Sequence, residues 1–148
     1  MFKPSRILVP TDLSEHSFKA IRQAFDIAQQ YNSEVFLLHV IRDPIQECSV
    51  DYCISKDLVN QLQAEMNESI RKGIKQQLSN LPSIDADKVV TDVKIGNPYE
   101  EILKEAEERD IELIVIASLG STGLAKFMIG SVARHVLLGA NCPVLLTK

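Results

Sequence analysis

The stretch RILVPTDLS at residues 6–14 joins an uninterrupted apolar run to a polar turn. Apolar residues at consecutive rather than alternate positions are typical of a strand that is covered on both faces in a parallel sheet. Ser14 can cap a helix after this turn, and side chains spaced by three or four residues predict the buried face of that helix. These side chains are Phe18, Ile21, Phe25 and Ala28. A second apolar run at 34–41 completes a predicted βαβ unit whose first strand is central.

A long helix is expected next, from about residue 55 to Pro82. Its apolar side chains recur at every fourth residue, at Leu58, Leu62, Met66, Ile70, Ile74 and Leu78. Four residues turn a helix by about 400°, so this stripe moves around the helix by about 40° at each step. We therefore expect a bend near Gly73, or a second apolar contact that accommodates the drift.

The remaining elements continue the alternation of strand and helix. An alternating strand at 88–95 suits a sheet edge, a helix begins at Asn97 and Pro98, and a fourth apolar strand covers 111–117. A last helix follows Gly130 and leads to a final strand at 142–147. The predicted buried faces of the two helices are Tyr99, Ile102, Leu103 and Ala106, and Ala133, Val136, Leu137 and Ala140. We expect one domain over residues 1–148, a doubly wound, Rossmann-like α/β fold with a five-stranded parallel sheet in the order 3-2-1-4-5 and helices on both faces.

Composition and charge argue against several classes of partner. The chain has 148 residues, with 16 Lys and Arg against 20 Asp and Glu, so its net charge is −4. Mild acidity without a basic run argues against nucleic acid, and no apolar stretch approaches the roughly 20 residues of a membrane span. No secretory signal is visible, so we expect a cytoplasmic protein. The cysteines, Cys48, Cys53 and Cys142, predict neither a disulfide framework nor a metal site.

Two segments lie at the carboxyl ends of predicted strands, where doubly wound sheets bind ligands. The first is Pro10-Thr11-Asp12, and the second is 117–131. Glycines in the second segment let backbone N–H groups approach an anion, and the following helix N-terminus offers unpaired donors with partial positive charge. Hydroxyls and one cation could complete a phosphate site, namely Ser118, Ser121, Thr122, Ser131 and Lys126. The same glycines also suit a simple turn before a capped helix, so both interpretations stay open.

Four stretches together carry a family resemblance: RILVPTDLS at 6–14, LLHV at 37–40, GNP at 96–98 and CPVLL at 142–146. Through them the chain resembles the universal stress protein family over nearly its whole length. The nucleotide-binding branch of that family carries G-x2-G-x9-G-S/T after the fourth strand. This chain reads Ala117-x2-Gly120-x9-Gly130-Ser131, with the spacing intact and alanine in place of the first glycine. A Cβ at Ala117 could crowd a ribose or a phosphate.

The resemblance implies a site for an adenine nucleotide, ATP or AMP. By position, adenine would pack near Val40 and the end of the first strand, at Pro10, Thr11 and Asp12. Ribose and phosphates would follow Ala117, Gly120, Gly130, Ser131 and Val132. Asp12 could hold Mg²⁺ beside ATP through water, or could instead bond backbone donors at the start of the first helix. The resemblance also implies a homodimer through the last strand, from Pro143 to Thr147, whose apolar edge invites pairing.

No spacing in the sequence predicts a catalytic set of residues, so we expect at most slow ATP hydrolysis. His39 lies within an apolar strand and is expected to be hydrogen-bonded and partly buried, while His16 and His135 suit exposed helix positions. The sequence favours a nucleotide-dependent dimeric module that regulates a stress response, in which nucleotide orders the loops 43–55 and 118–129. The alternative is a nucleotide-free dimeric interaction module whose pocket is closed by Ala117. A redox carrier is less favoured, because few aromatic residues are available to stack on a flavin.

Overall fold

The computed structural model of the chain describes residues 1–42, 55–81, 86–119 and 128–148. These residues form a five-stranded parallel sheet in the order β3-β2-β1-β4-β5. The strands are β1 (Arg6–Pro10), β2 (Glu34–Ile41), β3 (Val89–Ile95), β4 (Leu113–Ala117) and β5 (Val144–Thr147). The predicted fold class and strand order are therefore confirmed, with β1 in the centre and β3 at an edge.

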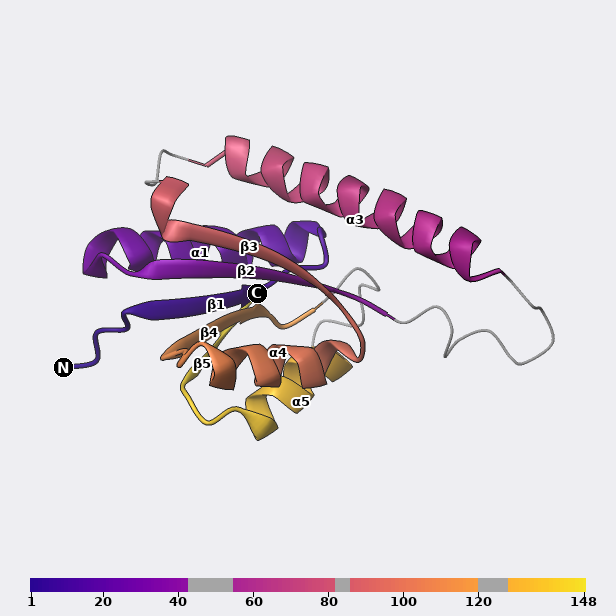
Figure 1. Ribbon diagram of the computed structural model, residues 1–148. Helices are drawn as coiled ribbons and strands as arrows, with labels where there is room; N and C mark the ends of the chain where they lie inside the picture. Colours follow the sequence, from indigo (N-terminus) through magenta and orange to yellow (C-terminus); the bar gives the residue numbers. More distant parts are fainter. Residues whose placement is uncertain (43–54, 82–85, 120–127) are drawn as a thin grey trace.

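Helices cover both faces of the sheet (Figure 1). On one face lie α1 (Glu15–Tyr31) and α3 (Lys56–Ser79), and on the other lie α4 (Pro98–Glu108) and α5 (Ser131–Gly139). A short 3-10 helix, η1 (Ala86–Lys88), leads into β3. In the part of the chain that the structure describes, no helix is both long and apolar enough to span a membrane.

Buried apolar side chains form two cores, one between the sheet and each layer of helices. Successive side chains of a strand point to opposite faces of the sheet. Val35 and Leu37 of β2 therefore pack on the side of α1 and α3, while Phe36 and Leu38 pack on the side of α4 and α5. Consecutive apolar residues in β2 are thus explained by burial on both faces.

Helix α1 is capped at both ends by residues that suit a helix terminus, Ser14 and Asn32. The Ser14 hydroxyl accepts a hydrogen bond from the Ser17 backbone N–H at 3.1 Å, and Asn32 adopts the left-handed conformation with φ of 61°. The prediction that Phe18 is buried is wrong, because it is only half-buried. The buried face is centred on Ser17, Ile21, Ala24 and Ala28, and Phe18 lies at its margin.

Helix α3 is continuous from Lys56 to Ser79, and only part of its predicted apolar stripe is buried. Ile70 and Ile74 are buried, whereas the side chains nearer its N-terminus, Leu58, Leu62 and Met66, are about half exposed. This part of α3 extends beyond the edge of the sheet (Figure 1). Gly73 is a point of close approach, since a Cβ there would lie 3.1 Å from Leu13 Cδ1. The drift of the stripe therefore carries its first half away from the protein.

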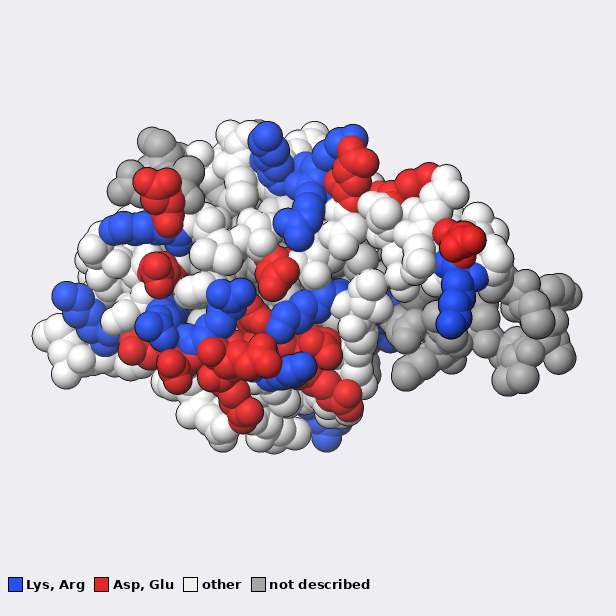
Figure 2. Space-filling view, in the orientation of Figure 1, with Lys and Arg blue, Asp and Glu red and all other residues white. Residues whose placement is uncertain are grey.

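The two helices on the other face begin where the sequence predicts. Asn97 is the N-cap residue of α4, but its side chain makes no capping hydrogen bond, and Pro98 follows at the first helical position. Leu137 of α5, which the sequence predicts to be buried, is 41% exposed, because the buried face of this short helix is limited to Ala133 and Val136. Acidic and basic side chains intermix over α4 on the face shown in Figure 2.

Candidate functional site

A cavity lies where the carboxyl ends of β1, β2 and β4 meet the N-termini of α4 and α5. Its volume is about 230 Å³. The residues that line it are Pro10, Thr11, Asp12, Ser17, Leu38, Val40, Arg42, Pro98, Ile102, Ile116, Ala117, Ser118, Leu119, Gly130, Ser131, Val132 and Ala133. Doubly wound folds bind their ligands at this end of the sheet, outside the carboxyl ends of the strands.

All predicted site residues that the structure describes line this cavity. They are Pro10, Thr11, Asp12, Val40, Ala117, Ser118, Gly130, Ser131 and Val132. Gly120 lies outside the described residues, as do Ser121, Thr122 and Lys126, and so does most of the two loops expected to respond to nucleotide. Segments separated by more than 100 residues in the sequence are thus brought to one place by the strand order.

The turn after β1 is held by a group of hydrogen bonds. Thr11 is 6% exposed, and its Oγ1 lies 3.0 Å from Ser17 Oγ and accepts from the Leu13 backbone N–H at 3.1 Å. The Thr11 backbone N–H also donates to the Leu38 carbonyl oxygen at 2.9 Å. The Asp12 carboxylate accepts from the Ser14 backbone N–H at 3.0 Å while its residue lines the cavity. The helix-start role expected of Asp12 is therefore observed, and it is compatible with a position at the site.

His39 supports this turn from the neighbouring strand. Its Nδ1 lies 2.8 Å from the Thr11 carbonyl oxygen, and because a carbonyl only accepts, Nδ1 carries the proton. Burial lowers the pKa of His39, and the Thr11 contact and the Asp12 charge oppose that shift only in part. The half-buried, hydrogen-bonded histidine predicted from the sequence is therefore confirmed, and this side chain holds the backbone behind the cavity wall.

The N-terminus of α5 forms the opposite wall. The Gly130 backbone N–H donates to the Ser118 carbonyl oxygen at 2.7 Å, which ties this helix start to the end of β4. The first N–H groups of a helix have no partner within it and carry partial positive charge. His135 donates from Nδ1 to the Ser131 carbonyl oxygen at 2.6 Å and stacks on Tyr99, with ring centroids 4.5 Å apart. The arrangement suits an anionic group near Ser131 and Val132.

Several residues that line the cavity were missed by sequence reasoning. They are Ser17, Leu38, Arg42, Pro98, Ile102, Ile116 and Ala133. Two of them carried a usable signal, because Leu38 and Arg42 share the side-chain direction of Val40 in a strand of period two. Pro98 and Ile102 belong to a helix that starts after the edge strand β3, so only the tertiary structure brings them to the site.

The cavity combines an apolar part with a polar rim. Leu38, Val40, Ile102 and Ile116 present hydrocarbon surface, which suits a flat apolar ring. The turn after β1 offers hydroxyl and carboxylate oxygens, and α5 offers backbone donors. Among the described residues, no group of His, Cys, Asp and Glu side chains could hold a metal ion by itself. The site can therefore bind a molecule that is apolar at one end and anionic at the other.

Comparison with known proteins identifies the family. The model of the universal stress protein family matches residues 3–148. The chain belongs to the universal stress protein family. Its relatives include the universal stress protein MJ0531 of Methanocaldococcus jannaschii, which is 32% identical over 97% of this chain and 81% of that protein. The solved structure of MJ0577, from the same organism, has a TM-score of 0.82 and 29% identity over 99% of this chain and 97% of that one.

Solved structures of other universal stress proteins contain adenine nucleotides. One is a complex with cAMP, with a TM-score of 0.65 and 18% identity over 99% of this chain and 98% of that one. Another is the Archaeoglobus fulgidus protein in complex with dAMP, with a TM-score of 0.58 and 21% identity over 99% of this chain and the whole of that one. At these identities the likeness to this chain is one of fold, and the bound nucleotides are properties of those two proteins.

Proposed function

We propose that this universal stress protein is a regulatory module that binds an adenine nucleotide, ATP or AMP, in the cavity at the carboxyl ends of β1, β2 and β4. One observation carries the proposal. The described positions of the family's nucleotide motif, Ala117, Gly130 and Ser131, line one cavity of about 230 Å³, with apolar side chains on one side and a helix N-terminus on the other. Relatives of the same fold in complex with cAMP and dAMP support the choice of ligand.

The proposed binding mode follows from the chemistry of each wall. Adenine would pack on Val40 and Pro10, with polar atoms of Thr11 and Asp12 at its edge or at the ribose. Phosphate oxygens would accept from backbone N–H groups at Ser131 and Val132, where the helix dipole favours negative charge. Mg²⁺ binds proteins through one or two carboxylates together with phosphates and water, so Asp12 is a suitable ligand beside bound ATP.

We propose binding rather than turnover as the main activity. Among the described residues that line the cavity, Asp12 is the only carboxylate, and its Oδ1 accepts from the Ser14 backbone N–H. A phosphoanhydride hydrolase needs a positioned water, a base and charge stabilisation together. Slow hydrolysis of ATP is the most that we expect from this set, and it would act as a timer on the bound state.

The regulatory unit that we propose is a cytoplasmic homodimer. The described part of β5 is an edge strand with half-buried and exposed apolar side chains, and Leu145 is 36% exposed. Such an edge pairs readily with a second copy of itself, in the two-fold arrangement that most oligomers adopt. Nucleotide would then change the surface that the dimer offers to a protein partner in a stress response.

A second candidate function is a nucleotide-free dimeric interaction module. Ala117 favours it, because this side chain lines the cavity where the family motif has glycine. In this case the dimer would recruit its partner without a bound ligand, and Ala117→Gly would restore binding.

The first experiment strips and identifies any bound ligand. The purified protein is heat-denatured, and the released small molecules are identified by mass spectrometry. Released ATP or AMP is the expected result. An empty protein whose melting temperature is unchanged by Mg-ATP would favour the nucleotide-free module, because a ligand that binds only the folded state must raise that temperature.

Two substitutions test the location of the phosphate end. Gly130→Val places a branched side chain at the start of α5 and should abolish nucleotide binding while the protein stays folded, as judged by circular dichroism and calorimetry. Ala117→Gly removes the Cβ from the cavity wall, and the relief of crowding should lower the AMP dissociation constant several-fold. A tenfold change corresponds to about 1.4 kcal/mol of binding free energy. Unaltered affinity in folded Gly130→Val would refute the phosphate position, and unaltered or weaker affinity in Ala117→Gly would refute crowding.

A further inference from the structure

Arg42 is a cation on the cavity rim that the nucleotide motif does not include. Arg42 directly follows β2 and is exposed, and it lines the cavity together with Leu38 and Val40. Leu38 and Val40 share one face of β2, and Arg42 follows at the next step of two, so all three lie along the same wall of the cavity. In the part of the chain that the structure describes, Arg42 takes part in no ion pair. Arg42 is thus an exposed cation at the rim of the cavity.

Arg42 and the start of α5 lie on opposite sides of the cavity. In the sheet, β1 separates β2 from β4, and neighbouring strands lie about 4.8 Å apart, so the ends of β2 and β4 are roughly 10 Å apart. The hydrogen bond from Gly130 N–H to the Ser118 carbonyl ties α5 to the β4 side. Arg42 stands on the β2 side, next to the apolar surface of Val40.

A mononucleotide carries its negative charge at one end only. The backbone donors and dipole of α5 favour that end, which leaves the base and its apolar faces toward Val40 and Arg42. Resting on the proposed function, we propose that Arg42 binds the base, so that it determines base recognition by this chain rather than phosphate affinity.

The guanidinium is well suited to this role. It is planar and weakly hydrated, it stacks on aromatic faces, and its fork of donors can bond ring nitrogens at a base edge. A purine held between the hydrocarbon of Val40 and the plane of Arg42 would be contacted on both faces. Lysine lacks the planar fork, so it would keep the charge and lose this contact. Asp12, which follows β1, also lines the cavity.

The test compares adenosine with AMP, because the two ligands share the base and differ by the phosphate. Dissociation constants are measured by calorimetry, or by ligand-observed NMR where binding is weak, for the unaltered protein and for Arg42→Ala. We expect Arg42→Ala to raise the dissociation constants of adenosine and of AMP by the same factor, roughly three- to tenfold. Arg42→Lys should restore little of this loss. Arg22→Ala is the matched control, since Arg22 is also exposed but lies on α1 and does not line the cavity.

The outcomes separate this inference from the proposed function. If Arg42→Ala lowers the affinity for AMP but not for adenosine, Arg42 binds the phosphate. If the affinity for both ligands is unchanged, Arg42 does not touch the ligand. Full recovery in Arg42→Lys would reduce its role to charge. Each of these results overturns the inference and leaves nucleotide binding in place. An unaltered protein that binds neither ligand would overturn the proposed function, and this inference with it.

Discussion

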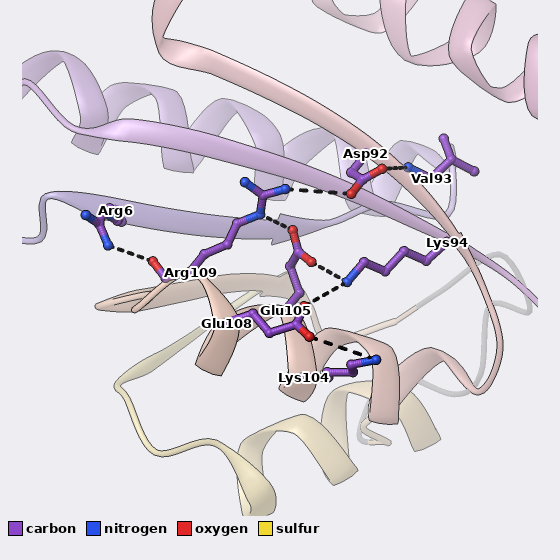
Figure 3. Close-up of polar contacts among 8 residues, drawn as sticks. All are labelled: Arg6, Asp92, Val93, Lys94, Lys104, Glu105, Glu108 and Arg109. Atoms are coloured by element: carbon purple, nitrogen blue, oxygen red, sulfur yellow. Dashed lines mark hydrogen bonds and ion pairs between the residues drawn. The ribbon is translucent and has the colours of Figure 1, made fainter.

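Glu105 is a charged residue that lies almost wholly inside the protein, with 2% of its surface exposed. Its Oε2 lies 2.5 Å from Lys94 Nζ, and its other oxygen contacts Arg109 Nε (Figure 3). The Arg109 guanidinium also lies over the Phe36 ring, 5.1 Å from its centroid, and pairs with Asp92 at 3.7 Å. The Glu105 carboxylate thus links β3, through Lys94, to the C-terminal end of α4, through Arg109. Both cations compensate the burial of its negative charge.

Removing this charge should destabilise the protein. Glu105→Gln leaves two cations without their carboxylate, and breaking a buried pair in this way costs about 2–4 kcal/mol. Chemical denaturation at pH 7 measures the loss in the free energy of unfolding. Glu108→Gln is the matched control, because Glu108 is half exposed and its substitution should change that free energy by less than about 0.5 kcal/mol. Equal effects of the two substitutions would contradict the assignment.

The same carboxylate predicts a pH dependence. Burial raises the pKa of Glu105, but hydrogen bonds and charge from Lys94 and Arg109 outweigh it and lower the pKa below its usual 4.5. A lowered folded-state pKa gives stability that is present above pH 4.5 and is lost as the pH falls through the folded value. The stability difference between the unaltered protein and Glu105→Gln should therefore be constant near neutrality and shrink below pH 4.5. Denaturation curves from pH 7 to pH 3 check this, and a difference that grows on acidification would refute it.

Helix α3 shows that an apolar stripe does not by itself measure burial. Leu62 is 53% exposed, whereas Ile74 is 1% exposed, although both belong to the same every-fourth-residue pattern. The stripe moves around the helix as predicted, so it meets α1 and the sheet only along its second half. The first half contributes little to the stability of the fold.

Two substitutions on α3 should therefore differ strongly. Ile74→Ala removes buried side-chain atoms and should lower the free energy of unfolding by about 2–5 kcal/mol. Leu62→Gln should change it by less than about 0.5 kcal/mol, because the side chain is already half in water. Denaturant titrations of the two variants provide the measurement. A large loss in Leu62→Gln would mean that this half of the helix is covered in solution.

The homodimer that we propose uses β5, an edge strand of the described sheet. Leu145→Asp places a charge on this edge strand and should convert the proposed homodimer into a monomer, as measured by light scattering after size exclusion. Nucleotide affinity should be kept, because Leu145 does not line the cavity. Leu62→Asp is the matched control, since α3 lies at the other side of the sheet and the dimer should persist. A monomeric unaltered protein, or a dimeric Leu145→Asp, would exclude this interface.

Much of the site was predictable because its chemistry is local. Ser14, Pro98 and Gly130 mark helix starts through their own backbone and side-chain preferences, and consecutive apolar residues mark buried strands. Parallel strands then place all their carboxyl ends on one side, so the sequence alone predicts that Thr11 and Ala117 lie near each other. The predicted site residues that the structure describes do meet in one cavity.

The sequence by itself predicted the class of fold and the strand order, and the structure confirms both. The individual strands and helices were predictable because hydrophobic period and capping act over a few residues. Ligand binding at the carboxyl ends of the strands stays a prediction. Only the tertiary structure decided which side chains complete the wall, such as Arg42 and Ile102, and which apolar residues stay in water, such as Leu62 and Leu137. It also decided that Glu105 would be buried, since its partner Lys94 reaches it from β3, a different element, whereas Arg109 lies only four residues further along, at the C-cap of the same helix. These outcomes depend on how far each helix overlaps the sheet, and that overlap is a property of packing between distant segments.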